Sequence, residues 1–316
     1  MEAVTGGTSP AKSDELKSTR PLIKMGWARA LLYLFASIVA TLLFAVISSY
    51  FVFNFTGISA AAMPAGEGNL AKFIGPYREA LRRGLPFLGV VLVTWLFRKY
   101  IDKKSMLSLG FELKNYKWDL SNGLVWGFGT ISCGFLFLYL TEQITVVNIN
   151  FDPVLLFGYL LTLIIAAVNE EIMMRGYILK NLFCSMNRYV ALVVSSIFFG
   201  LLHLGNANVT LLSFINISLA GIFLGIYYLH KQNLWFPIGL HLTWNFFQGP
   251  VWGFEVSGSQ VQGVFTLVRH GGDLWTGGVF GFEASILATI ILICSTVILH
   301  FQYKQTRNTN AEAEVV

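Results

Sequence analysis

Charged side chains are scarce in this chain of 316 residues. Asp, Glu, Lys and Arg make up 12% of it, about half of what a soluble domain carries, while 55% of the residues are hydrophobic. The mean hydropathy is +0.62. Apolar stretches of about 17 residues or more, enough for a helix to cross a bilayer, recur along the whole chain. The composition therefore excludes an ordinary soluble domain and predicts an all-α, polytopic integral membrane protein.

Several motifs of enzymes and metal sites are also missing. The cysteines Cys133, Cys184 and Cys294 form no CxxC pair, which argues against a disulfide framework or a zinc knuckle and predicts small buried apolar residues. The chain has no GxSxG serine elbow and no HExxH zinc motif. It also lacks the paired internal repeats that are common in transporters. Serine-hydrolase and zincin chemistry are therefore not indicated.

We expect about eight membrane-spanning helices. The candidate spans lie at about 27–53, 84–98, 121–144, 153–180, 189–204, 208–229, 234–252 and 282–302. They form one transmembrane helical domain over 26–305, between a polar tail at 1–25 that is predicted to be disordered and a second tail at 306–316. No signal-peptide cleavage pattern precedes the first apolar run, so we expect that helix to stay in the membrane.

The positions of Lys and Arg predict the orientation. In a membrane protein the net charge of +5 reports topology rather than nucleic-acid binding. Basic residues concentrate in the N-terminal tail and in 98–120, whereas 145–152 has none and 253–281 has only Arg269. Both termini are therefore predicted to be cytoplasmic. The loop 54–83 is an exception, because it is basic on the predicted outer side, and we interpret its segment NLAKFIGPYREALRRG as an interfacial amphipathic helix.

Polar side chains occur inside three of the predicted spans. Each ionisable group there costs about 2.5–3.5 kcal/mol on insertion scales and marks a candidate functional site. They are Glu170, Glu171 and Arg175 in the fourth span, His203 at the end of the fifth, and His241 and Asn245 in the seventh. At about 1.5 Å per residue these groups lie ~15–22 Å from the basic residues at the ends of their own helices. We therefore expect one shared site within the membrane.

The spacing separates these residues by role. Glu171 and Arg175 are four residues apart, so they share a helix face and are expected to pair, and His241 and Asn245 share a face in the same way. Glu170 is rotated by about 100° from Glu171 and points elsewhere. We predict that Glu171 is the structural partner of Arg175 and that Glu170 stays free.

Such a set is suited to amide hydrolysis without a covalent intermediate. A carboxylate beside a histidine can deprotonate a water, and a second histidine with an asparagine amide can stabilise an oxyanion. Other interpretations remain open: a structural Glu–Arg clamp with interhelical histidine hydrogen bonds, a proton-coupled transporter, or a non-proteolytic membrane scaffold or immunity protein. Two histidines and two glutamates could also hold zinc, although asparagine is a poor zinc ligand.

The three motifs resemble those of a known family. EEIMMR at 170–175 fits EExxxR, FGLLH at 199–203 fits FxxxH, and HLTWN at 241–245 fits HxxxN. Their order resembles the CPBP family of CAAX-protease and bacteriocin-processing membrane proteins, also called Abi. The resemblance covers about 153–250, and the expected helix count is similar to that of the family's type II CAAX prenyl endopeptidases.

The resemblance implies roles for these residues. Glu170 would be the base and would act with His203 on the water. His241 and Asn245 would form the oxyanion hole, and Glu171 with Arg175 would support the site. The implied enzyme is a membrane-embedded glutamic-type endopeptidase that needs no cofactor, with zinc as the alternative. We expect a membrane-associated peptide or protein as substrate, the lipid bilayer as partner, no nucleic acid, and a bacterial plasma membrane as location.

Overall fold

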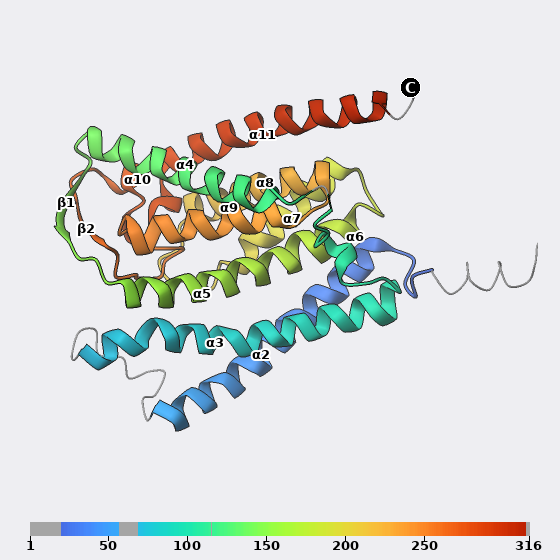
Figure 1. Ribbon diagram of the computed structural model, residues 1–316, viewed down its shortest axis with the longest axis horizontal. Coiled ribbons are helices and arrows are strands. Elements are labelled where there is room, and N and C mark those ends of the chain that lie inside the picture. The colour runs from blue at the N-terminus through green and yellow to red at the C-terminus, as the bar shows by residue number, and fades with distance from the viewer. Residues whose placement is uncertain (1–19, 57–68, 115, 314–316) are drawn as a thin grey trace, which may run out of the picture.

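The computed structural model describes residues 20–56, 69–114 and 116–313, and the fold within them is a bundle of long helices (Figure 1). The predicted N-terminal tail thus lies largely outside the described residues. The main helices are α2 (Gly26–Thr56), α3 (Asn69–Leu96), α4 (Asp119–Leu140), α5 (Pro153–Glu171), α7 (Arg188–Leu202), α8 (Leu211–Lys231), α9 (Trp235–Phe246) and α11 (Ile286–Ala313). The short helices α6 (Lys180–Leu182) and α10 (Asp273–Thr276) lie in connections.

The fold confirms a polytopic helical membrane protein, although not the expected count of spans. Six helical segments of the described chain are long and apolar enough to cross a membrane. The other two expected spans are shorter helices: α7 has 15 residues, and α9 has 12 before it continues as a π-helical turn, Phe247–Val251. At about 1.5 Å per residue neither reaches across a 30 Å hydrocarbon core as an α-helix alone.

Two end regions differ from the sequence-based prediction. The segment interpreted as an interfacial helix is the first half of α3, which runs without interruption into the apolar stretch, so its candidate span begins at Glu79 rather than at 84. At the other end of the chain, α11 continues to Ala313, past the expected start of the tail. The three cysteines are exposed on the protein surface and not buried, so that prediction was wrong.

Local sequence signals start the helices that carry the candidate site. Asp152 precedes α5 and accepts hydrogen bonds from the backbone N–H groups of Val154 and Leu155, with Pro153 at the first helical position. Asn187 caps α7 in the same way. Thr210 and Ser213 form a reciprocal capping box at the start of α8. These caps fix where each helix starts and therefore the height of its polar side chains.

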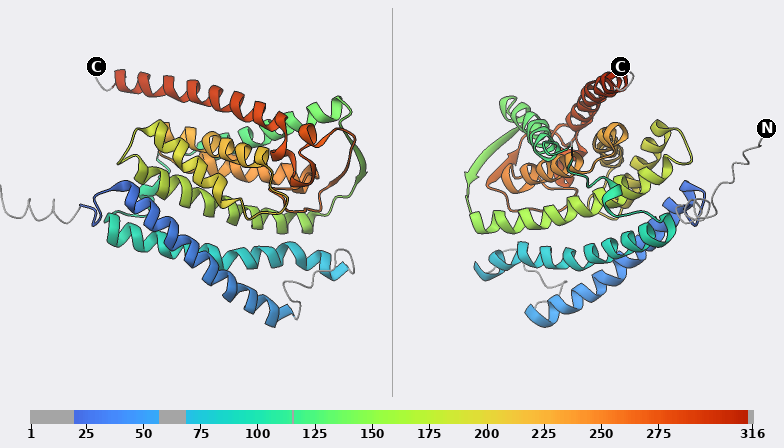
Figure 2. Two further views of the ribbon diagram at one scale, coloured as in Figure 1. Left: turned by 180° about the vertical axis from the view of Figure 1, so that it is seen from behind. Right: turned by 45° about the vertical axis from the view of Figure 1, so that its right-hand side comes forward.

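Helix α8 lies at the centre of the bundle (Figure 2). Of its most apolar window, 56% is buried inside the protein, against 22–39% for the other candidate spans. Those other helices expose apolar side chains, as expected of surfaces that face lipid. The core around α8 includes the aromatic residues Tyr177, Tyr227, Tyr228 and Phe236. The candidate site is built against this rigid central helix.

An unpredicted two-stranded sheet closes one end of the bundle. Strand β1 (Ile144–Ile149) pairs antiparallel with β2 (Phe265–Arg269), and the register is irregular between Val146 and Asn148. The sheet joins the connection before α5 to the long connection between α9 and α11. In Figure 1 it lies at the opposite end from α6.

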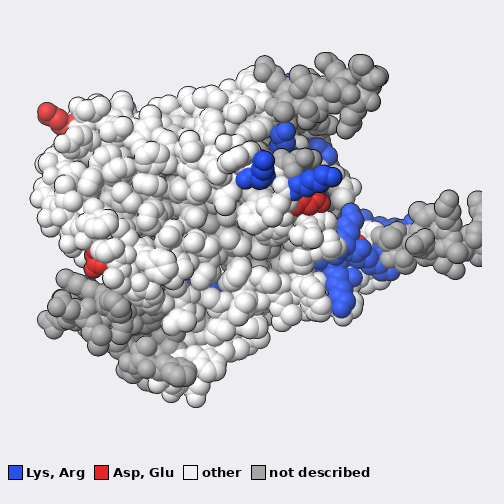
Figure 3. Space-filling model, in the orientation of Figure 1, with Lys and Arg blue, Asp and Glu red and all other residues white. Residues whose placement is uncertain are grey.

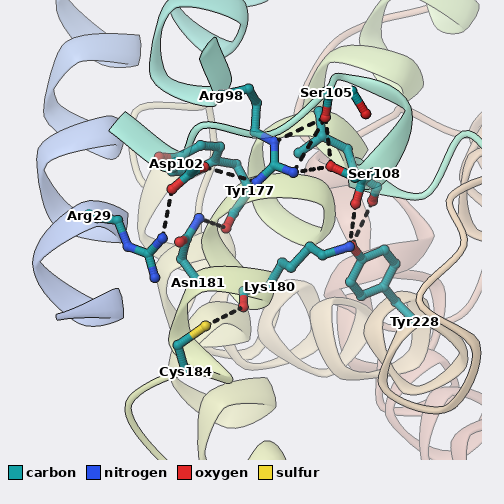
Figure 4. A network of polar contacts seen from close by, with 11 residues as sticks. Arg29, Arg98, Asp102, Ser105, Ser108, Tyr177, Lys180, Asn181, Cys184 and Tyr228 are labelled. Carbon is teal, nitrogen blue, oxygen red and sulfur yellow. Dashed lines mark hydrogen bonds and ion pairs between the residues drawn. The ribbon is translucent and has the colours of Figure 1, made fainter. Parts of the chain in front are cut away.

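A buried ionic cluster holds the other end together (Figure 4). Asp102, with a fully buried side chain, accepts hydrogen bonds from Arg29 of α2 at 2.8 Å and from Arg98 at 2.9 Å. Arg98 and Asp102 belong to the π-helical turn Phe97–Asp102 that follows α3. Beside them, Lys180 donates to the carbonyl oxygen of Ser108. Because removing one partner of a buried ion pair leaves an uncompensated charge, this cluster fixes α2 and α3 against the end of α5 and its extension.

Candidate active site

The two adjacent glutamates lie where the fourth predicted span changes its helical type. Glu170 and Glu171 are the last residues of α5, which continues as the π-helix Ile172–Leu179. π-Helical turns within α-helices are frequently found at functional sites. The side chain of Glu171 is completely buried, whereas that of Glu170 is 29% exposed. The two carboxylates therefore have different surroundings, although they are neighbours in sequence.

Glu171 is held by Arg175, as the spacing predicts. Arg175 Nη1 donates to Glu171 Oε1 at 3.0 Å, and Nη2 donates to the carbonyl oxygen of Gly221 in α8 at 3.1 Å. The guanidinium also lies 4.6 Å from the ring centre of Phe199 in α7. This arginine thus joins the extension of α5 to α7 and α8 while it compensates the Glu171 charge.

His241 of α9 lies between the two glutamates. Its Nδ1 atom is 2.9 Å from Glu171 Oε1, and because a carboxylate accepts hydrogen bonds, Nδ1 carries the proton. Its Nε2 atom faces Glu170 Oε2 at 3.8 Å. Glu171 therefore orients His241 and sets its tautomer.

His203 reaches the same carboxylate from the end of α7. Its Nδ1 donates to the carbonyl oxygen of Phe199 at 2.7 Å, which leaves Nε2 directed at Glu170 Oε2, again at 3.8 Å. A separation of 3.8 Å is too long for a direct hydrogen bond. Within the described residues, Glu170 Oε2 is buried and has no hydrogen-bond partner. Two histidine nitrogens and one carboxylate oxygen thus converge on one point.

Asn245 lies one helical turn after His241 and lines the same cavity, which has a volume of about 700 Å³. Glu170, His203 and His241 also line it. The amide of Asn245 makes no side-chain hydrogen bond to any part of the chain that the structure describes. It is thus available to a bound group. All the predicted site residues lie around this cavity except Glu171 and Arg175, which stand behind it.

Sequence reasoning missed a second polar group in the cavity wall. Glu283, just before α11, accepts hydrogen bonds from the backbone N–H of Ser257 at 2.7 Å and from its hydroxyl at 2.9 Å. Asn206 donates to the carbonyl oxygen of Ser257 at 2.9 Å. Burial raises the pKa of Glu283 above its ordinary value, although its bonds to Ser257 oppose the shift. An acid at the edge of an apolar run, in GFEAS, was the signal that could have found it.

Comparison with known families decides which interpretation of the motifs holds. Residues 152–247 match the family model described as type II CAAX prenyl endopeptidase Rce1-like. This segment is Rce1-like. It contains all three motifs and every predicted site residue, so the resemblance to the CPBP family is confirmed over these positions. Comparison with curated proteins and with solved structures gives no match.

The Rce1-like segment supports an enzyme of the protease type. Its donors do not fit a metal ion well. Across 20–56, 69–114 and 116–313, no group of three or more His, Cys, Asp and Glu side chains is arranged to hold one. The Nδ1 atoms of both site histidines are already occupied by Glu171 and by the Phe199 carbonyl. The arrangement instead provides a carboxylate, two oriented imidazoles and an amide around one cavity.

Proposed function

We propose that this protein is an intramembrane endopeptidase in which Glu170 and His203 activate a water, and His241 and Asn245 stabilise the oxyanion. The observation that carries the proposal is the convergence of His203 Nε2 and His241 Nε2 on Glu170 Oε2, each at 3.8 Å. A water bridges polar groups at this separation with a normal hydrogen bond to each. Its position would be set by three side chains from α5, α7 and α9.

The proposed reaction follows from the protonation states. Glu170 takes a proton from the water, whose oxygen forms a bond to the carbonyl carbon of the substrate. His203, with its Nδ1 proton bound to Phe199, accepts a hydrogen bond from the water through Nε2. When the C–N bond breaks, Glu170 returns the proton to the leaving amine. No covalent enzyme intermediate is formed.

Stabilisation of the oxyanion requires His241 to be an imidazolium. Because Nδ1 already donates to Glu171, Nε2 becomes a donor only when a second proton is present. The carboxylates of Glu170 and Glu171 favour that charged form. With Arg175 and the imidazolium opposite the two carboxylates, the buried set is neutral overall. Nε2 and the Asn245 amide can then both donate to the developing oxyanion.

The proposed substrate is a membrane-associated peptide or protein, and the proposed location is a bacterial plasma membrane. The cavity supports a peptide substrate, because its wall combines apolar side chains such as Leu163 and Phe223 with the polar groups at Glu170 and Asn245. We propose no cofactor and no nucleic-acid partner.

Comparative terminal proteomics of membranes tests the proposal. Membranes with the unmodified protein are compared with membranes carrying Glu170→Gln, and Glu112→Gln, at an exposed site remote from the cavity, serves as the matched control. We expect a set of new peptide termini with the unmodified protein and with Glu112→Gln that disappears with Glu170→Gln. The same termini at full abundance from correctly inserted Glu170→Gln protein would refute the mechanism.

A further inference from the structure

The cavity extends from the candidate site in one direction only. Along α5 its wall runs from Met174 back through Glu170 and Tyr159 to Leu155. The stretch from Glu170 to Leu155 corresponds to about 22 Å of helix. It leads away from Lys180 and towards the end of the bundle that carries the β1–β2 sheet.

The other walls lie on the same side. The connection after α9 contributes Val256 to the wall, with the exposed polar residues Ser259 and Gln260 at its rim. Helix α3 contributes Glu79, which accepts hydrogen bonds from Arg82 and Arg83. Among the described residues that line the cavity, none falls within 84–154, 175–198 or 225–239. The cavity therefore has a polar rim towards the sheet end and no wall from the segments at the opposite end.

That opposite end is the basic end of the molecule. Figure 3 shows Lys and Arg gathered there, and in Figure 1 helix α2 begins and α11 ends at the same end. Its exposed basic residues include Lys24, Lys99, Lys103, Lys104, Lys114 and Lys117. Short connections rich in Lys and Arg stay in the cytoplasm. By this rule the basic end is cytoplasmic and the sheet end is extracytoplasmic.

We infer that the cavity around Glu170 opens to the extracytoplasmic side of the membrane, so that its substrate is a peptide segment presented from that side. The access route rests on the geometry and the charge distribution. The substrate class rests in addition on the proposed endopeptidase function. A lipidated tail in the cytoplasm would face the end at which the cavity has no wall and no rim. An exported or membrane-inserted precursor, with an extended segment outside the bilayer, meets the polar rim directly.

Thiol accessibility measures the access route without any enzyme assay. In a background in which Cys133, Cys184 and Cys294 are replaced by serine, two positions of α5 form a matched pair: Ala166, which lines the cavity, and Ile164, which is exposed on the helix surface but does not line it. Lys104→Cys marks the basic end. A charged, membrane-impermeant methanethiosulfonate is applied to right-side-out and to inverted vesicles.

We expect Ala166→Cys to react at least tenfold faster in right-side-out vesicles than in inverted ones, and Lys104→Cys to show the opposite preference. Ile164→Cys, facing lipid, should react in neither. Reaction of Ala166→Cys mainly in inverted vesicles would overturn the inference. Equal reaction from both sides, or none from either, would overturn a cavity open on one side.

A second measurement separates the access route from the proposed function. A bulky, impermeant maleimide is attached at Gln260→Cys on the rim or at Lys104→Cys, and cleavage of a substrate found by terminal proteomics is followed. We expect the label at Gln260→Cys to slow cleavage at least tenfold and the label at Lys104→Cys to leave it unchanged. The reverse result would refute entry from the sheet end. If the unmodified protein cleaves nothing, the endopeptidase proposal fails while the thiol measurement still decides the access route.

Discussion

The imidazole of His241 donates from Nδ1 to the carboxylate of Glu171, its partner 70 positions earlier in the chain, at 2.9 Å. The same oxygen, Oε1, also accepts from Arg175 at 3.0 Å. Glu171 therefore touches no point of the cavity itself, and it acts by positioning one cation and one imidazole. This relationship distinguishes the two glutamates more sharply than their order in the sequence does.

The first prediction concerns this positioning role. Glu171→Gln leaves the buried Arg175 without its carboxylate, and we expect the free energy of unfolding to fall by about 3–5 kcal/mol. The double variant Glu171→Gln with Arg175→Met should recover much of that stability, because no buried charge remains. It should not recover cleavage, because His241 loses its anionic acceptor. Thermal unfolding in detergent and the cleavage rate are measured together, and recovery of both would show that Glu171 is only a clamp.

The second prediction concerns the oxyanion. Asn245→Ala removes an amide donor and should lower kcat about 10²–10³-fold with a smaller change in KM. Asn206→Ala is the matched control, since Asn206 lines the same cavity but binds the Ser257 carbonyl. Steady-state kinetics on one substrate compare the two variants. Equal losses for both would assign Asn245 to cavity structure rather than to the transition state.

The third prediction concerns pH and Glu283, which lies outside the membrane-spanning segments. Burial raises the pKa of its carboxyl in the folded state above the ordinary value of 4.5. Its neutral form therefore favours folding, and that stability is fully present below pH 4.5 and is lost as the pH rises through the folded-state pKa. Glu283→Gln stays neutral, so its unfolding temperature should decrease less than that of the unmodified protein over this range. Parallel curves of unfolding temperature against pH would contradict the assignment.

The fourth prediction concerns metal dependence. Because the site histidines direct their Nδ1 protons to Glu171 and to a backbone carbonyl, we expect a strong chelator to leave the cleavage rate within about twofold of its untreated value. Elemental analysis of the purified active protein should give zinc well below one atom per chain. Loss of activity with a chelator, restored by added zinc, would replace the glutamate mechanism with a metal-dependent one.

Much of the candidate site could be predicted from helical spacing alone. The interval of four residues places Arg175 beside Glu171, and a 100° rotation separates Glu170 from both. Which nitrogen of His241 meets Glu171 could not be predicted, because it depends on how α9 is rotated against α5. The catalytic roles of these residues remain predictions.

The sheet and the lengths of two helices were beyond the sequence for different reasons. Strands β1 and β2 are short and lie far apart in the chain, and their pairing depends on loops whose ends only the folded bundle brings together. For α9, the apolar run 234–252 indicates hydrophobicity but not where the helix changes type, and Pro250 lies within the π-helical turn that ends it. Hydropathy records what lipid tolerates, whereas helix length follows from backbone hydrogen bonding.

The π-helix Ile172–Leu179 has a consequence for how this segment tolerates change in length. Its hydrogen bonds join residues five apart, so each such turn contains one residue more than an α-helical turn would. Deleting a single residue there would permit an ordinary α-helix, but it would rotate everything after the deletion by about 100° relative to Glu171. Asn181 and the residues that meet the Arg29–Asp102–Arg98 cluster would then face the wrong way. The segment can accept substitutions more readily than insertions or deletions, and its length is as specific a part of the site as its glutamates.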